Sequence, residues 1–346
     1  MKKYLLITLP ILIFILSLIL LPSAQARPSA PDSTRPQREA AVARAMTWLH
    51  SKQRVGGDRD GAICSDQNNE ICSIGGSCDI VRVAALAGED PDGPTWTPGS
   101  VSLLGRCKLD LPDYLARKDA GRIAKVLRAA VAAGEDPRHF GGYDLIALLE
   151  AQYDAETGFY HPYNLFRNAL ALIALDEAGR PIPQKAIAAI AGEQNPDGCW
   201  GWPIGGDVTD TDTTGMVIDA LAGAGQADIP AVRQCISRLR EIQNDDGGWE
   251  LSGIYDDKVS NVDSTALVTQ GLVAAGWDPE GPAFTKNRTA VAALLAFQAD
   301  DGSFWWRYDN AGTPLLGTQQ AIQPLLMTYP NEIPKPLALY LPLAMR

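Results

Sequence analysis

The sequence has few histidines and a shortage of positive charge. Only three histidines occur in 346 residues (His50, His139 and His161), and none has a ligand-like spacing to a cysteine. No two cysteines form a C-x-x-C pair, so a structural zinc site has little support, and neither a metal nor a cofactor is expected. Lys and Arg number 30 against 41 Asp and Glu, a net charge of −11. So acidic a chain is a poor partner for nucleic acid or for an anionic membrane surface.

Long apolar runs are missing beyond the N-terminus. The first 26 residues have the order of an export signal: Lys2 and Lys3, an apolar stretch, then the small-residue cleavage site Ala24-Gln25-Ala26. An uncleaved membrane anchor is the alternative, and it would be the chain's only membrane attachment. We therefore expect an exported protein, secreted or at the cell surface. The expected division of the chain is a signal peptide over 1–26, a disordered linker over 27–39, a helical domain over 40–330 and an apolar C-terminal tail over 331–346.

All six cysteines follow the export signal. An even number of cysteines in an exported chain favours disulfides over free thiols. Six cysteines permit fifteen pairings, and spacing alone does not choose among them. We expect two bridges within Cys64 to Cys107 and one between Cys199 and Cys235.

A helix-stop signal recurs along the chain. Small residues are followed by Gly and then by Pro, as in Ala133-Gly134-Glu135-Asp136-Pro137, and the five such glycines lie 46, 45, 46 and 51 residues apart. Glycine adopts the left-handed conformation that ends a helix, and proline prevents the helix from continuing. The spacing predicts a repeat of about 47 residues.

A second signal lies between these stops. It consists of Gln, a polar turn with Asp-Gly and then an aromatic residue, at Gln194 to Trp200, Gln243 to Trp249, Gln298 to Phe304 and more loosely Gln152 to Phe159. Because Asp-Gly forms tight turns, each unit is predicted to be helix, turn, helix and stop. A degenerate first copy begins at Gln53, and a unit over about 98–137 is assigned by period alone. The second helix of each unit has fewer charges and more small residues, which suits the inside of a ring.

These turns, the pairs Asp212-Thr213 and Asp263-Ser264, and the final segment 318–325 resemble the squalene cyclase and prenyltransferase repeat superfamily. The resemblance covers about residues 40–330 and implies an all-α α6/α6 toroid of six helical hairpins. It also implies that the Gln and Trp of each turn tie adjacent helices together. The final segment and the export signal look most like the helical domain of secreted cobalamin carriers, such as transcobalamin and intrinsic factor, and their uncharacterised bacterial relatives.

The segment Asp210-Thr211-Asp212-Thr213-Thr214 resembles the acid motif of class II terpene cyclases, in which a protonated central Asp protonates an alkene. Asp212 takes the central position and Asp210 accompanies it, but Thr213 replaces the third acid. The alternative, which we favour here, makes Asp212 the N-cap of a helix beginning at Thr213. Asp263 precedes Ser264 in the same context without an acid motif.

Other chemistries have weaker support. Prenyltransferase zinc chemistry and a thioester both lack their residues, and clustered acids such as Asp58 and Asp60 raise calcium as a minor alternative. The main prediction is a non-catalytic module that binds a small molecule or an extracellular protein. The alternatives are a class II terpene cyclase-like enzyme using Asp212, and a corrinoid-binding protein. The predicted ligand-binding residues are four aromatic side chains outside the repeat motif: Trp202, Tyr163, Tyr255 and Trp306.

Overall fold

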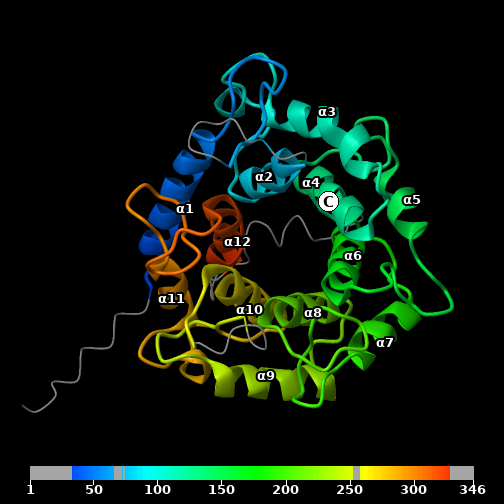
Figure 1. Ribbon diagram of the computed structural model, residues 1–346, viewed down its shortest axis with the longest axis vertical. Coiled ribbons are helices and arrows are strands. Elements are labelled where there is room, and N and C mark those ends of the chain that lie inside the picture. Colours follow the sequence, from blue (N-terminus) through cyan, green and yellow to red (C-terminus); the bar gives the residue numbers. More distant parts are fainter. Residues whose placement is uncertain (1–32, 66–71, 73–74, 252–257, 328–346) are drawn as a thin grey trace, which may run out of the picture.

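The computed structural model describes residues 33–65, 72, 75–251 and 258–327, and the described chain forms a double ring of helices (Figure 1). Six helices form the inner ring, and the helices between them along the chain form the outer ring. Because each inner helix packs against the next and α12 packs against α2, the inner ring is closed. The predicted α6/α6 toroid is confirmed, and the described residues contain no β-strand beyond isolated bridges.

The two rings alternate strictly along the chain. The outer helices are α1 (Arg35–His50), α3 (Leu103–Leu115), α5 (Leu145–Glu150), α7 (Gln184–Gly192), α9 (Pro230–Ile242) and α11 (Ala290–Ala296). The inner helices are α2 (Gly76–Leu86), α4 (Ala120–Ala132), α6 (Leu165–Glu177), α8 (Thr211–Gly223), α10 (Val262–Ala274) and α12 (Pro314–Met327). Two short 3₁₀ segments, Pro94–Trp96 and Pro282–Phe284, precede α3 and α11. The period therefore identified the second unit correctly, although that unit lacks the turn motif.

The predicted stops end the inner helices. After α4 and α8 the chain turns at Gly134 and Gly225, whose φ angles are 72° and 74°. In the second case Gln226 N donates to Leu221 O at 2.7 Å, which satisfies a carbonyl at the end of α8. Glycine is required at these positions because a side chain makes the left-handed conformation unfavourable.

Except at Gln152, the glutamine of each described turn motif clamps one unit to the next. Gln194 Nε2 donates to Gly198 O in its own turn and to Ala231 O in the following outer helix. Gln243 Nε2 donates to Gly247 O in its own turn and to Phe284 O in the 3₁₀ segment before α11. Gln298, in the last unit, donates to Gly302 O at 3.0 Å and to Ala41 O of α1 at 2.7 Å. The repeated contact therefore runs from the last unit back onto the first and closes the outer ring.

The aromatic residue of each turn is fixed by a hydroxyl of the following inner helix. Trp200 N donates to Thr214 Oγ1, and Phe304 N likewise donates to Thr318 Oγ1. Trp249 N donates to Thr265 Oγ1 in the unit between them. All three aromatic side chains are fully buried. These bonds explain why Thr recurs near the start of the inner helices.

The junction between the last and first units also contains an ion pair. Arg38 of α1 is buried and pairs with Glu280, which in turn accepts a hydrogen bond from Ser33. Trp48 Nε1 donates to Asp301 Oδ2 at 3.1 Å. Contacts between segments about 250 residues apart in the sequence therefore hold the two ends of the ring together.

Replacing the closing glutamine is expected to weaken the fold. Gln298→Ala leaves Ala41 O and Gly302 O without their donor, and we expect the free energy of unfolding to fall by about 1–2 kcal/mol. The matched control is Gln152→Ala, because Gln152 Nε2 donates only to Leu148 O within its own hairpin among the described contacts. Chemical denaturation measures both variants. Equal losses of stability would contradict a closing role for Gln298.

Three disulfides are formed, and they follow the expected grouping. They join Cys64 to Cys72, Cys78 to Cys107, and Cys199 to Cys235. Such bonds are compatible with an extracellular protein. Among the described residues, no helix has both the length and the apolar character needed to cross a membrane.

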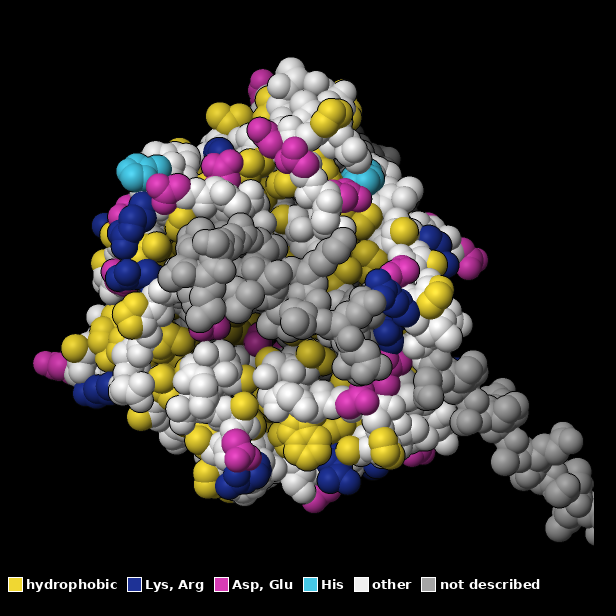
Figure 2. All heavy atoms as spheres, turned by 180° about the vertical axis from the view of Figure 1, so that it is seen from behind, with side chains coloured by type: hydrophobic (Ala, Val, Ile, Leu, Met, Phe, Trp, Pro, Cys, Tyr) yellow, Lys and Arg dark blue, Asp and Glu magenta, His cyan; other side chains and the backbone are white. Residues whose placement is uncertain are grey.

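The helical domain begins earlier in the sequence than predicted. Helix α1 begins at Arg35, so the helical domain starts inside the segment that was predicted to be a disordered linker. A Thr34 cap and proline at the first turn explain this early start. The predicted signal peptide and the tail over 331–346 lie outside the described residues. On the face opposite to Figure 1, acidic and basic side chains are intermixed around the described periphery (Figure 2).

Candidate functional site

Two aspartates occupy equivalent positions on neighbouring inner helices. Asp212 is the second residue of α8, and Asp263 is the second residue of α10. The prediction that Asp212 is the N-cap is wrong, because Asp210 caps α8 through Oδ1, which accepts from Thr213 N at 2.7 Å. Asp210 N also donates to Trp200 O, which fixes the earlier residue at the helix start. The carboxyl group of Asp212 is therefore not needed for capping.

Asp212 is held as a largely buried acid. Ser264 Oγ, on α10, donates to Asp212 Oδ1 at 2.6 Å. Burial, together with the negative charges of Asp210 and Asp263, raises the pKa of Asp212 to about 7 against the opposing effect of the Ser264 hydrogen bond. A substantial fraction of Asp212 is therefore protonated at neutral pH, which is the state needed for proton donation.

The two neighbouring acids are also unusual. Burial raises the pKa of Asp263 to about 6, and its Oδ1 atom is buried without a hydrogen-bond partner among the described residues. Burial likewise raises the pKa of Asp210. Burial thus raises the pKa of all three carboxyl groups, and strongly perturbed pKa values of this kind are typical of catalytic acids.

Small residues bring the two acid-bearing helices together. A Cβ atom on Gly215 of α8 would lie 2.3 Å from Leu267 O, and one on Gly271 of α10 would lie 2.5 Å from Gly215 O. The backbone of α8 at Gly215 is thus in direct contact with the backbone of α10 at Leu267 and Gly271. This close packing places Ser264 within hydrogen-bonding distance of Asp212.

A cavity of about 290 Å³ lies among the six inner helices. Its lining differs from one side to the other. The apolar wall consists of residues from α6, α8 and α10: Phe166, Leu170, Met216 and Leu267. The polar wall consists of residues from α12, α2 and α4: Gln319, Gln320, Gln323, Asp79, Arg82, Lys125 and Arg128. Three lining residues are exceptions to this division. On the polar side two are apolar, Val83 and Leu316, and on the apolar side one is polar, Gln270.

The acids lie one helical turn from the apolar wall. Asp212 precedes Met216 by four residues, and Asp263 precedes Leu267 by four, so each shares a helix face with a cavity-lining side chain. Neither aspartate itself lines the cavity. The arrangement puts a protonated carboxyl group at the N-terminal end of an apolar surface.

Ion pairs organise the polar wall. Glu177, at the end of α6, pairs with Arg82 at 3.0 Å and with Arg128 at 2.7 Å. The two arginines lower the pKa of Glu177 to about 2 despite its burial, so this carboxyl group is ionised. Lys125 Nζ lies 3.0 Å from Asp79 Oδ2. The wall is thus a fixed set of charges inside the ring.

The predicted ligand-binding aromatics lie elsewhere. Tyr163 and Trp202 are 74% and 50% exposed, and their backbones pair where Leu165 N donates to Trp202 O and Ile204 N to Tyr163 O. The structure therefore brings these two residues together, but neither lines the cavity. Trp306 is partly buried and contacts the Arg307 guanidinium, and Tyr255 lies outside the described residues.

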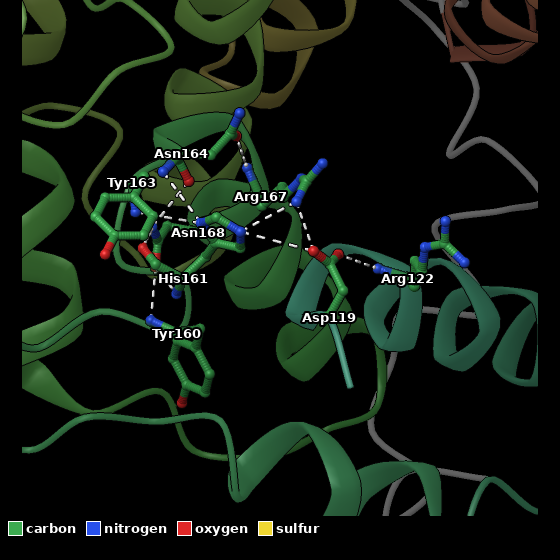
Figure 3. A network of polar contacts seen from close by, with 8 residues as sticks. All are labelled: Asp119, Arg122, Tyr160, His161, Tyr163, Asn164, Arg167 and Asn168. Atoms are coloured by element: carbon green, nitrogen blue, oxygen red, sulfur yellow. Dashed lines mark hydrogen bonds and ion pairs between the residues drawn. The ribbon is translucent and has the colours of Figure 1, made fainter. Parts of the chain in front are cut away.

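A polar network supports Tyr163 at the start of α6 (Figure 3). His161 Nδ1 accepts from Tyr163 N and Asn164 N, and Asn168 Oδ1 accepts from Tyr160 N. Asn168 thus has the role that a threonine hydroxyl has in the three units that follow. Burial and the charge of Arg167 lower the pKa of His161, although Asp119 opposes them. The ring nitrogen therefore remains available to accept these backbone bonds.

The charged residues of the polar wall were not predicted from the sequence. The inner helices were recognised by their low charge, and Arg82, Lys125, Arg128 and Glu177 are exceptions to that rule. A charged residue on an otherwise apolar inner helix is the signal that could have identified them. Ser264 was named only as part of a capping pair, and its bond to Asp212 depends on how α8 and α10 pack.

Comparisons with known proteins agree with this fold. Residues 159–321 match the family of squalene-hopene cyclase C-terminal domains. The type II terpene cyclase MstE from Scytonema, without ligand, has a TM-score of 0.59 and 14% identity over 85% of this chain and 98% of its own. An MstE variant in complex with its substrate, geranylgeranyl dihydroxybenzoate, has a TM-score of 0.58 and 14% identity over the same shares. A glycosidase variant in complex with glucose has a TM-score of 0.51 and 15% identity over 84% of this chain and 96% of its own.

These matches correct the main functional prediction. A non-catalytic binding module was expected, and that expectation is contradicted, because residues 159–321 match a family of cyclase domains and the MstE structures that share the fold are type II terpene cyclases. The resemblance to cobalamin carriers stays a prediction. At these identities the structures share the fold alone. The described chain is an α/α toroid of the squalene cyclase-like type, matching the cyclase C-terminal domain over about half of its length.

Proposed function

We propose that the protein is an enzyme of the class II terpene cyclase type, in which Asp212 is the acid that starts the reaction. The observation that carries the proposal is the buried Asp212 carboxyl group, whose pKa is raised to about 7 and which lies one turn from an apolar cavity wall. The match of residues 159–321 to squalene-hopene cyclase domains supports the same reaction class.

The proposed chemistry begins with proton transfer. The O–H bond of Asp212 breaks as the π electrons of a substrate alkene form a new C–H bond, which leaves a carbocation on the substrate and a carboxylate on Asp212. Further alkene π electrons close a ring on the cation, and loss of a proton from carbon gives a neutral product. The net reaction is an isomerisation, after which solvent returns a proton to Asp212.

The protein has identifiable parts for each step. The apolar wall, with Met216 one helical turn from Asp212, keeps water away from the cation. Ser264 donates a hydrogen bond to the carboxylate that remains after proton transfer. The cavity of about 290 Å³ is at the small end of the range for ligand sites, which favours short prenyl chains.

The test is product formation from linear prenyl substrates of increasing length, from geranyl to geranylgeranyl, analysed by mass spectrometry. We expect a cyclised isomer of unchanged mass, with the best rate for the shorter chains. Folded protein that leaves every substrate unchanged would contradict the proposal. The same assay gives the pH dependence used below.

The neighbouring aspartate sets the pH range of the reaction. Activity should fall as pH rises through the pKa of Asp212, because only its protonated form donates. Asp263→Asn removes a negative charge that raises this pKa, so the falling limb of kcat should move to lower pH. Glu241→Gln on the exposed face of α9 is the control and should leave the limb in place. A limb unaffected by Asp263→Asn would show that another group titrates.

We also infer that the chain acts after export, in an oxidising compartment. Its three disulfides support this inference, together with the signal-like order of residues 1–26. The substrates of an exported enzyme are small molecules present outside the cytosol. N-terminal sequencing of secreted protein tests the inference. The expected N-terminus is Arg27, and protein retained in the cytosol with reduced cysteines would contradict it.

A further inference from the structure

Among the described residues that line the cavity, one side chain, Asp79, can act as a base. The proposed reaction ends when a carbon atom of the cation loses a proton, and a group in the cavity must accept it. The lining contains no histidine, tyrosine or cysteine, and its one carboxyl group is that of Asp79. Its arginine and lysine side chains are cations, and the amides of its glutamines are not basic.

An ion pair keeps Asp79 in its carboxylate form. Lys125 Nζ lies 3.0 Å from Asp79 Oδ2, and the charge of Asp79 raises the pKa of Lys125, so the lysine stays a cation. Asp79 is also in the first turn of α2, where a helix N-terminus stabilises negative charge. Among the described contacts only Oδ2 accepts a hydrogen bond, and the Asp79 side chain is 22% exposed. Its Oδ1 atom is therefore available to a ligand.

The other acidic groups near the polar wall are less suited to this role. Both carboxyl oxygens of Glu177 accept from Arg128, and the Glu177 side chain is only 5% exposed. Asp219 accepts from Gln270, and Asp176 lies close enough to Asp219 for their charges to interact. None of these three acids lines the cavity. A substrate in the cavity would therefore reach Asp79 and not the others.

Asp79 lies across the inner ring from Asp212. The inner helices contact one another in the order α2, α4, α6, α8, α10, α12 and again α2, so α2 and α8 are on opposite sides of the ring (Figure 1). Each aspartate is in the first turn of its helix. The cavity takes lining residues from both helices. A substrate between them has the acid of α8 toward one side and the carboxylate of α2 on the other.

We propose that Asp79 is the base that ends the reaction by removing a proton from carbon after the ring has closed. The inference rests on the proposed function for the carbocation and on the cavity for the identity of the base. In this step a C–H bond next to the cationic carbon breaks, its electron pair forms the new C=C bond, and the proton passes to Asp79 Oδ1. Solvent then removes this proton and restores the carboxylate. Lys125 is a positioning residue, because it holds Oδ2.

The test is the product that Asp79→Asn forms from a prenyl substrate that the wild type cyclises. Substrate should still be consumed, because protonation by Asp212 comes first. Asparagine is similar in size but is not a base, so water attacks the cation in its place. The product then carries an added hydroxyl group and is heavier than the substrate by one water molecule, whereas the wild type gives an alkene of unchanged mass.

Mass spectrometry measures the ratio of the hydroxylated product to the alkene. We expect this ratio to rise at least about 100-fold in Asp79→Asn, the low end of the contribution of a general base. A variant that still gives the same alkene, with no increase in hydroxylated product, would overturn the proposal.

The control is Lys125→Met, which breaks the same ion pair but keeps the Asp79 carboxylate. Its main product should remain the alkene, whatever its rate. The double variant Asp79→Asn/Lys125→Met leaves neither partner unpaired, so it keeps the test valid if Asp79→Asn fails to fold, and it should give the hydroxylated product. Equal amounts of hydroxylated product from Lys125→Met and Asp79→Asn would show that the ion pair matters and not the base, which would overturn the proposal.

Failure of this inference is distinguishable from failure of the proposed function. If the wild type cyclises a prenyl substrate and Asp79→Asn gives the same alkene, the cyclase proposal stands and the role of Asp79 is rejected. If the wild type leaves every prenyl substrate unchanged, the cyclase proposal fails, and the role of Asp79 fails with it.

Discussion

Asp212→Asn is expected to lower kcat for cyclisation by at least about 1,000-fold, while the affinity for substrate changes little. Asparagine has nearly the same shape as aspartic acid and can still accept from Ser264 Oγ, but it has no acidic proton to give to an alkene. Single-turnover product formation and a separate binding measurement distinguish the two effects. Retention of more than a tenth of the activity would rule out Asp212 as the acid.

The stability of Asp212→Asn distinguishes loss of the acidic proton from damage to the fold as the cause of its lower kcat. The pKa of Asp212 is raised from about 4 in the unfolded chain to about 7 in the folded one, so ionisation costs stability increasingly as pH rises between these values. Asp212→Asn removes this cost. The variant should therefore be more stable than wild type at pH 8, by about 4 kcal/mol, and lose this advantage below about pH 4. An inactive variant that is less stable at pH 8 would indicate a damaged fold.

Gly215→Ala is expected to lower the free energy of unfolding by about 3 kcal/mol. The new Cβ atom would lie 2.3 Å from the carbonyl oxygen of Leu267, and backbone atoms cannot move aside as a flexible side chain can. Helices α8 and α10 must then separate, which lengthens the bond between Ser264 and Asp212. We therefore expect the cyclisation activity to fall as well. Chemical denaturation and turnover, measured on the same preparation, test both effects.

The control for this change is Gly192→Ala. Gly192 ends α7 on the outer ring, and a Cβ atom there would meet nothing within 4 Å. Alanine favours the helix over glycine, so this variant should be unchanged or more stable by up to about 1 kcal/mol. Similar losses in both variants would show that helix contact at Gly215 is not the cause.

The fold was largely predictable because its signals are local and repeated. The Gly-Pro stops and the Gln-to-Trp turns each follow from the backbone chemistry of a few residues, and the turns recur in the unit that begins at Gln298. The prediction that the ring closes came from the family resemblance, because a repeat of the same period also fits an open solenoid. The bond from Gln298 to Ala41 O that closes it joins residues 257 apart, and sequence spacing cannot specify such a contact.

The site was predictable only in part. The carboxyl group of Asp212 was singled out by its motif. Which of Asp210 and Asp212 caps α8 could not be decided from the sequence, because the choice depends on the bond that Asp210 N donates to Trp200 O. The raised pKa comes from burial and from Asp263 on another helix, both of which are tertiary effects. The exposed aromatics Tyr163 and Trp202 were chosen by residue type, whereas the cavity is lined by residues that face inward from six separate helices.

The most direct test of this account is a carbon NMR titration of the aspartate carboxyl groups, with Asp212→Asn used to assign the resonance. We predict that one resonance absent from the variant titrates near pH 7 in the folded protein. If the Asp212 resonance instead titrates at or below about pH 4, the residue is an ordinary carboxylate at neutral pH and cannot be the acid proposed here.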